Sequence, residues 1–323
     1  MTSAEVEEFL RRCAKGDKPA VIKAVKKFGK DILKRTGAEY GQTPLHVCCE
    51  NGRDELASYL LQDRFSGFVN VHATEKNGWT PLHAACKGGH MDIIEMLLKR
   101  GAVLRAVTNE GATPLHYFVR LGEGDDPVKH NRIMKTIMQG SFIDAENKHG
   151  QTPLHQAAGN SRFQNVIYLI QQNADCNKRD RHGDTALHFA ARVNNAESGE
   201  LLLRFHADPT ITNVEGTTPY SLVRKWDSAF RQSLINWYLE KNREMPPEMV
   251  QDLESQTDSG SETRARAESA RTSARPASTL IPSKLLNFLL LSLSLTSARP
   301  FSPLTREGDG PCHISAPNGK STR

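Results

Sequence analysis

The feature that most constrains this chain is a four-residue motif, Thr-Pro-Leu-His, that returns at nearly constant spacing. It begins at Thr43, Thr80, Thr113 and Thr152, and weakened copies begin at Thr185 and Thr218. The threonine positions step by 37, 33, 39, 33 and 33 residues. Self-similarity at a period of this length is typical of solenoids, in which copies of one small unit stack on each other.

The copy that begins at Thr80 indicates what one unit folds into. The Thr80 hydroxyl can cap a helix whose first turn holds a proline, where a missing N–H costs nothing. Gly78 and Gly89 allow positive φ angles in the turns before and after that helix. A second apolar run at helical spacing extends from Ile93 to Leu98. Two helices this short cannot bury their apolar faces alone, so the unit must stack on neighbouring copies.

This pattern resembles the ankyrin-repeat family, whose period is 33 residues and whose signature is Thr-Pro-Leu-His-x-Ala. The resemblance covers roughly the first three quarters of the chain. It implies an all-α solenoid of stacked helix–turn–helix units with β-turns that project as fingers. We therefore expect an N-terminal capping unit at residues 1–39, five repeats at 40–214, a C-terminal capping repeat at 215–245 and a disordered low-complexity tail at 246–323.

The tail is expected from a change of composition after residue 247. Residues 251–278 are rich in Ser, Thr, Arg and Glu and cannot form an apolar core. The uncharged run at 285–298 is shorter than the roughly 20 residues of a membrane-spanning helix. For its leucine-rich part, 285–295, three interpretations stay open: a membrane or partner contact, a segment docked on the solenoid, and a non-family tail from splicing or read-through. We favour the last and do not expect membrane contact through 285–295.

Histidine is the first candidate for chemistry, because the chain has 12 of them. Five occupy the same position of the repeat: His46, His83, His116, His155 and His188. The resemblance implies that these side chains hydrogen-bond to the backbone and tie one turn to the next. Neighbouring copies lie about 10 Å apart, too far to share a metal ion. Phosphate-binding glycine loops, nucleophile elbows and zinc-protease motifs are also missing from the sequence. We expect no enzyme activity, no cofactor and no metal.

Charge and cysteine usage narrow the classes of partner and compartment. The net charge of +5 is modest, and basic residues are mixed with acidic ones, so nucleic-acid binding is not expected. Cys48, Cys49 and Cys86 fall in or beside the small-residue positions of the repeat, which indicates reduced thiols. The acidic N-terminus has no apolar core of a secretory signal. We expect a monomer in the cytoplasm, or in the nucleus as well.

The resemblance implies a non-enzymatic scaffold or adaptor that binds a partner protein through its concave face and finger turns. The family's usual contact positions fall here on Tyr40, Gln42, Glu50, Lys76, Trp79, Lys87, Arg120, Lys148, His149, Gln151, Arg179, Arg181, His182, Asp184, Arg192 and Lys225. Basic members outnumber acidic ones, and Tyr40 and Trp79 have no core role in the repeat pattern. We therefore expect an acidic partner surface anchored by an apolar side chain near Trp79.

The chain is also compatible with a regulatory region, or a truncated isoform, of a larger multidomain signalling enzyme. The lysines of the N-terminal unit, at positions 18, 23, 26, 27, 30 and 34, are expected to form a solvated cap rather than a dedicated site.

Overall fold

The computed structural model describes residues 2–124, 126–224 and 228–257. Within these ranges the chain is helical and contains no β-strand. The helices form pairs, each with an inner and an outer member. The first pair is α1 (Ser3–Lys15) and α2 (Lys18–Phe28), followed by the 3-10 helix η1 (Lys30–Lys34). The inner helices of the later pairs are α3 (Pro44–Glu50), α5 (Pro81–Gly88), α7 (Pro114–Phe118), α9 (Pro153–Gly159), α11 (Ala186–Arg192) and α13 (Pro219–Leu222).

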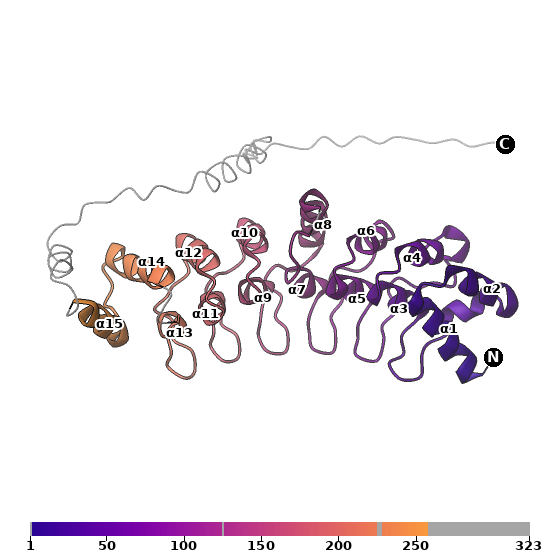
Figure 1. Ribbon diagram of the computed structural model, residues 1–323, viewed down its shortest axis with the longest axis horizontal. Helices are drawn as coiled ribbons and strands as arrows, with labels where there is room; N and C mark the ends of the chain where they lie inside the picture. Colours follow the sequence, from indigo (N-terminus) through magenta and orange to yellow (C-terminus); the bar gives the residue numbers. More distant parts are fainter. Residues whose placement is uncertain (1, 125, 225–227, 258–323) are drawn as a thin grey trace, which may run out of the picture. The chain divides into compact units, whose positions relative to one another are not determined.

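The outer helices make a second layer on the inner ones (Figure 1). They are α4 (Asp54–Leu60), α6 (Met91–Lys99), α8 (Pro127–Gly140), α10 (Phe163–Gln171), α12 (Ala196–Arg204) and α14 (Ser228–Glu240). Each inner helix packs on the next inner helix, as α3 does on α5 and α9 on α11. The loops between pairs project from the inner layer as fingers (Figure 1). The predicted all-α solenoid is confirmed.

The first turn of α5 shows why the motif starts a helix. The Thr80 side chain accepts a hydrogen bond from the backbone N–H of His83, and Pro81 occupies the first turn. Leu82 points into the stack and is fully buried. The same threonine cap precedes α3, α7, α9, α11 and α13. The sequence motif is therefore a helix start that simultaneously delivers one leucine to the core.

The turn between inner and outer helices needs a left-handed residue. Gly89 has φ +75° there, whereas the fourth and fifth repeats use Ser161 at φ +55° and Asn194 at φ +58°. These side chains occupy a region that favours glycine, and asparagine tolerates it better than serine. The repeats thus keep the same turn with different residues.

The two longer repeats place their extra residues in loops. In the first repeat, residues 63–65 form the 3-10 helix η2 (Asp63–Phe65), whose Phe65 is buried against Tyr59 with ring centroids 5.1 Å apart. In the third repeat, the extra residues precede α8, and Asp126 caps that helix by accepting a hydrogen bond from the Lys129 N–H. The insertion in the first repeat therefore adds a buried side chain to the core, and the insertion in the third repeat ends in a helix cap.

The chain continues as a helix where the sequence predicts the start of the tail. Residues after 246 form α15 (Pro247–Thr257), and its Met249 is fully buried. The Asp252 carboxylate accepts a hydrogen bond from the Tyr220 hydroxyl at 3.1 Å and forms an ion pair with Arg231. The predicted tail boundary at 246 is wrong, because this helix packs on the array through the buried Met249 and the partly buried Leu253, and through the Asp252 carboxylate. The rest of the predicted tail, 258–323, lies outside the described residues.

Met249→Ala is expected to release α15 from the array. The substitution removes the helix's fully buried apolar anchor and should cost on the order of 2 kcal/mol locally. Hydrogen exchange of the α15 amides should speed up by tenfold or more. Val250→Ala is the matched control, because that neighbouring side chain is exposed. Unchanged exchange in Met249→Ala would mean that α15 is not held by this contact.

Candidate partner-binding site

The five repeat histidines form a ladder that runs along the inner helices. In each, Nδ1 accepts the N–H of the capping threonine, as His83 does from Thr80 at 3.1 Å. Nε2 donates to a carbonyl of the next finger at 3.0–3.2 Å, as His83 does to Ala112. These contacts tie one turn to the next, which is the structural role that the resemblance implies for the five histidines. They leave no ring nitrogen free for a ligand.

Burial also keeps this ladder neutral. It lowers the pKa of His83 and of His116 to about 4, because the charged ring would lose its hydration. Burial lowers the pKa of His46, His155 and His188 in the same direction. The fingers are thus held in register by neutral donors, which gives any surface built on them a fixed geometry.

The candidate surface is the inner-helix face, meaning the finger turns and the exposed side of the inner helices. Between the first and second fingers it holds a groove of about 390 Å³. The groove is lined by Tyr40, Gln42, His46, Glu50, Glu75, Asn77, Trp79, Ala84 and Lys87. Tyr40 is 50% exposed, so an aromatic ring stands at the groove's edge.

Trp79 has a packing role that its place in the repeat pattern did not predict. Its ring lies 4.7 Å from the ring of Tyr117 on the next inner helix, and it packs on the buried core. The Lys87 ammonium lies over the Trp79 ring, 5.0 Å from its centroid. The expectation that Trp79 has no core duty is therefore wrong. It is a half-buried anchor that presents part of its surface to the groove.

Several predicted contact residues use their polar atoms in hydrogen bonds within the array. Lys76 donates from Nζ to the carbonyls of Ala38 and Glu39, both at 2.7 Å, and so joins two fingers. Gln42 donates to Glu50 at 2.9 Å. These residues line or border the groove, but their charge or amide is partly satisfied before any partner arrives.

Asp184 was predicted to contact a partner, but its side chain is buried. It accepts hydrogen bonds from Arg192 at 2.7 Å and Asn213 at 2.9 Å. Burial alone would raise the pKa of Asp184, but these two donors outweigh it and lower that pKa. Arg179 likewise donates to the Thr212 carbonyl at 2.8 Å. Asp184 therefore joins its finger to the next one through Asn213 and binds Arg192 of its own repeat, which is still half-exposed.

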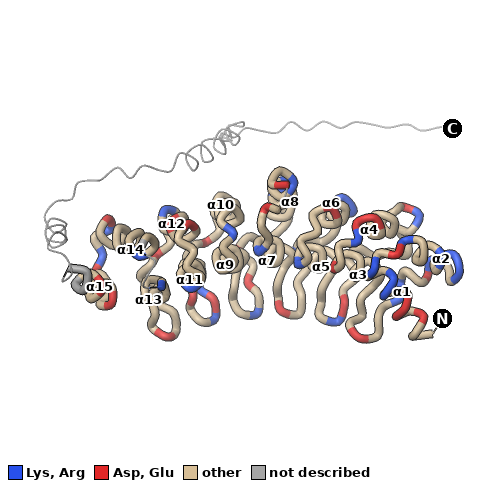
Figure 2. The backbone as a smooth tube through the Cα atoms, viewed as in Figure 1, with Lys and Arg blue, Asp and Glu red and all other residues tan. Residues whose placement is uncertain are grey.

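A basic tip forms on the fourth and fifth fingers. Lys148, His149, Arg181 and His182 are all exposed there. His149 Nε2 lies 3.9 Å from a Glu110 carboxylate oxygen on the third finger. We call these four residues the basic tip. Figure 2 shows Lys and Arg on the finger loops below α9 and α11.

The remaining predicted residues are spread out. Arg120 is exposed at the end of α7, and its carbonyl accepts from Arg162 Nε at 2.8 Å. Gln151 is half-buried and accepts from Gln156 at 2.6 Å. Lys225 lies outside the described residues. The predicted set thus divides into a groove at Trp79, a basic tip two and three fingers further along, and residues that hold the fingers together.

Two aromatic residues of this face escaped the sequence prediction. The ring of Tyr117 packs at a tilt against that of Trp79. Phe189 packs edge-on against His155, and Arg192 lies over the Phe189 ring at 5.6 Å. Both directly follow the motif histidine, or the histidine of a weakened copy. A bulky ring at that position, where other repeats have Val47 or Ala84, was the available signal.

Metal binding and membrane crossing have no counterpart among the residues described. His, Cys, Asp and Glu side chains form no group of three there that could hold a metal ion. No helix in the same ranges is both long and apolar enough to cross a bilayer. The run at 285–295 lies outside them.

Comparisons with known proteins agree with this geometry. A family model described as ankyrin repeats in three copies matches residues 127–213, and one described as ankyrin repeats in many copies matches 45–98 and 83–122. The solved ankyrin repeat domain of human ASB11 is 25% identical with a TM-score of 0.59, covering 74% of this chain and 98% of that one.

Curated relatives match over a shorter stretch. A B-cell lymphoma 3 protein homolog of Mus musculus is 30% identical over 137 residues, or 42% of this chain and 29% of the relative. A probable serine/threonine-protein kinase of Dictyostelium discoideum is 31% identical over 140 residues, or 42% of this chain and 16% of the kinase. The matched part is less than a third of either relative's length. The family matches, the motif period and the stacked helix pairs show that this chain belongs to the ankyrin-repeat family.

Proposed function

We propose that this chain is a non-enzymatic scaffold or adaptor that binds a partner protein along its inner-helix face. The observation that carries the proposal is the pairing of a half-buried aromatic anchor with a separate basic tip on one rigid array. Trp79 and Tyr40 offer the groove an apolar contact, and aromatic side chains often dominate interface energy. The basic tip offers the positive charges of Lys148 and Arg181 to acidic residues, with the imidazole rings of His149 and His182 beside them.

The expected partner is an extended, acidic protein segment. Its apolar side chain enters the groove at Trp79, and its acidic residues reach the basic tip two and three fingers away. The groove itself contains Glu50, Glu75 and Lys87, so acidity in the partner matters at the tip rather than at the groove. We place this binding in the cytoplasm, or also in the nucleus, with the chain acting as a monomer.

Trp79→Ala is expected to weaken partner binding by 2 kcal/mol or more, about 30-fold, because it removes the anchor of the groove. It should also cost about 1 kcal/mol of folding stability, since the contact with Tyr117 is lost. Affinity capture with residues 1–257, followed by titration of the captured protein, measures the first effect. Circular dichroism checks that the variant is folded.

Phe142→Ala is the matched control, because this aromatic side chain is 60% exposed and outside the groove. A second pair of variants separates the tip from the rest. Lys148→Glu with Arg181→Glu should slow association, and less so at high salt, whereas Lys135→Glu with Arg204→Glu on the outer helices should not. Full affinity in both Trp79→Ala and the tip variant would place the binding surface elsewhere.

A second candidate function is a regulatory region of a larger signalling enzyme. It is favoured by the match to a Dictyostelium kinase, of which the aligned part is only 16%. Immunoblotting of cells with an antibody to residues 40–214 decides it. A band much larger than 35.9 kDa that also yields peptides of a catalytic domain would favour this candidate.

A further inference from the structure

The net positive charge of the chain is concentrated in residues 15–35, which contain α2 and η1. Residues 15–35 contain seven lysines and Arg35 against two acidic residues, Asp17 and Asp31. Their net charge of +6 exceeds the +5 of the whole chain, so the remaining residues are together close to neutral. Charge of this density on one short stretch is a surface property that composition alone does not reveal.

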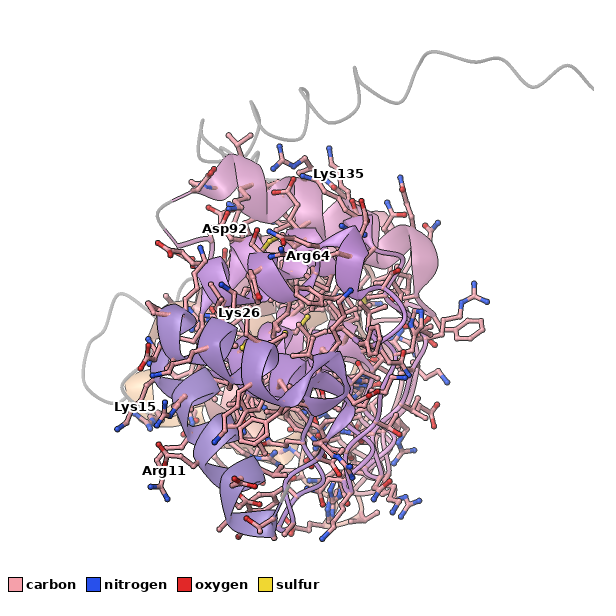
Figure 3. The ribbon with its side chains drawn as sticks, turned by 90° about the vertical axis from the view of Figure 1, so that its right-hand side faces the viewer. Arg11, Lys15, Lys26, Arg64, Asp92 and Lys135 are labelled. Atoms are coloured by element: carbon pink, nitrogen blue, oxygen red, sulfur yellow. The ribbon has the colours of Figure 1, made fainter. Side chains whose placement is uncertain are left out.

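The exposed side of α2 carries lysines around an apolar centre. The helix turns Val21 and Val25 into the core and leaves Lys23, Lys26 and Lys27 exposed. A shallow hollow of about 470 Å³ lies on this side, lined by Lys18, Pro19, Ile22, Lys23 and Lys26. We call the exposed side of α2, formed by these residues and Lys27, the α2 face. It is the end of the array seen in Figure 3, where Lys26 lies on α2 in the foreground.

Acidic side chains do not neutralise the centre of the α2 face. Asp17 caps the helix by accepting the Ala20 N–H at 3.0 Å. Lys18, at the edge, lies 3.6 Å from Glu55, whose side chain is 86% exposed. Figure 2 shows basic residues following one another along α2. The field in front of the α2 face is therefore positive.

The basic surface continues into η1 and η2. The ammonium groups of Lys30 and Lys34 lie 5.6 and 4.8 Å from the ring centroid of Phe68. Lys30 also donates to the Arg64 carbonyl at 3.1 Å. Here again lysines lie against apolar surface, with their ammonium groups close to an aromatic ring.

We propose that the α2 face docks on the anionic leaflet of a membrane. Clusters of four to eight basic residues on an amphipathic helix attract anionic headgroups, and each contributes about fivefold to binding. Pro19 and Ile22 supply apolar contact at the interface, and lysines around them can reach the headgroups. Protein–protein interfaces are depleted in lysine and enriched in arginine, and this face has only lysine. The chemistry thus favours a lipid surface over a protein partner.

The test is sedimentation of the full chain with vesicles of phosphatidylcholine, with and without phosphatidylserine. The full chain should bind only the phosphatidylserine vesicles, and added salt should weaken binding. Lys23→Glu with Lys26→Glu should weaken it by at least about 25-fold, because two contributions of about fivefold are lost. Both side chains are exposed, so circular dichroism should show an unchanged fold.

The matched control is Lys148→Glu with Arg181→Glu, which changes the net charge equally at the basic tip. It should keep vesicle binding within about twofold of the parent. An equal loss in both pairs would overturn the proposal, because net charge rather than the α2 face would explain binding. Absence of binding to phosphatidylserine vesicles at low salt would also overturn it. A third result would overturn it as well: a chain that does not bind vesicles but binds single-stranded RNA or polyglutamate, and that loses this binding in the Lys23→Glu, Lys26→Glu variant.

Discussion

Leu82→Ala is expected to lower the free energy of unfolding by about 2–5 kcal/mol. Leu82 is fully buried in α5, between the neighbouring inner helices α3 and α7. Its removal leaves a cavity in a stack whose units are stable only through their neighbours, so both interfaces of the second repeat weaken. Urea denaturation followed by circular dichroism measures the change.

Two variants on the same helix calibrate this result. His83→Ala should cost less, on the order of 1–2 kcal/mol, because it removes hydrogen bonds between turns rather than a core side chain. Lys87→Ala should leave the stability within about 0.5 kcal/mol, since this side chain is exposed. A loss of less than about 1 kcal/mol in Leu82→Ala would contradict the cavity argument.

The parts of the fold that depend on local sequence were predictable. Thr80 and the following proline define a helix start whatever lies around them, and the structure has that cap. Gly78 and Gly89 were predicted to allow positive φ angles in the turns on either side of that helix, and they have φ +78° and φ +75°. Helix caps and left-handed turns depend on residues within a few positions of each other, so they can be predicted from one copy of the motif.

The functional surface was less predictable, because its properties depend on contacts between repeats. The packing role of Trp79 comes from Tyr117, which lies 38 positions later. Asp184 is buried where Arg192 of its own repeat and Asn213 of the next finger converge on it. A position in a repeat specifies the direction of a side chain, but not which neighbour it meets.

The predicted start of the tail at residue 246 was wrong for a related reason. Residues 247–257 look polar in sequence, with Met249 and a few other apolar side chains among charged ones. Besides the buried Met249, their attachment includes the ion pair of Asp252 with Arg231 on α14, whose side chain is only 12% exposed. A polar segment can thus extend a solenoid when the last helix pair presents a buried partner for its carboxylate.

Acidification is expected to destabilise the array between about pH 6.5 and pH 4. In the unfolded chain the histidine pKa is about 6.5, whereas burial lowers that of His83 and His116 to about 4. The unfolded state therefore binds more protons in this range, and the free energy of unfolding falls as the pH drops. Stability is full above the unfolded pKa. Each of these two histidines should remove roughly 3 kcal/mol by pH 4, and the other three act in the same direction.

Urea denaturation at a series of pH values tests this, with His83→Gln and His116→Gln combined as the decisive variant. The variant is less stable at pH 7, but its stability should fall less steeply below pH 6.5, by about 1.4 kcal/mol per pH unit for each histidine removed. His182→Gln, in which an exposed ring is removed, should keep the parent slope. Asp184 contributes in a separate and lower range: because its pKa is lowered in the folded state, its stabilisation begins to fall only below the ordinary aspartate pKa of about 4 and is lost as the pH falls through the lowered value. An unchanged slope in the double variant would mean that the ladder is not what makes the array sensitive to acid.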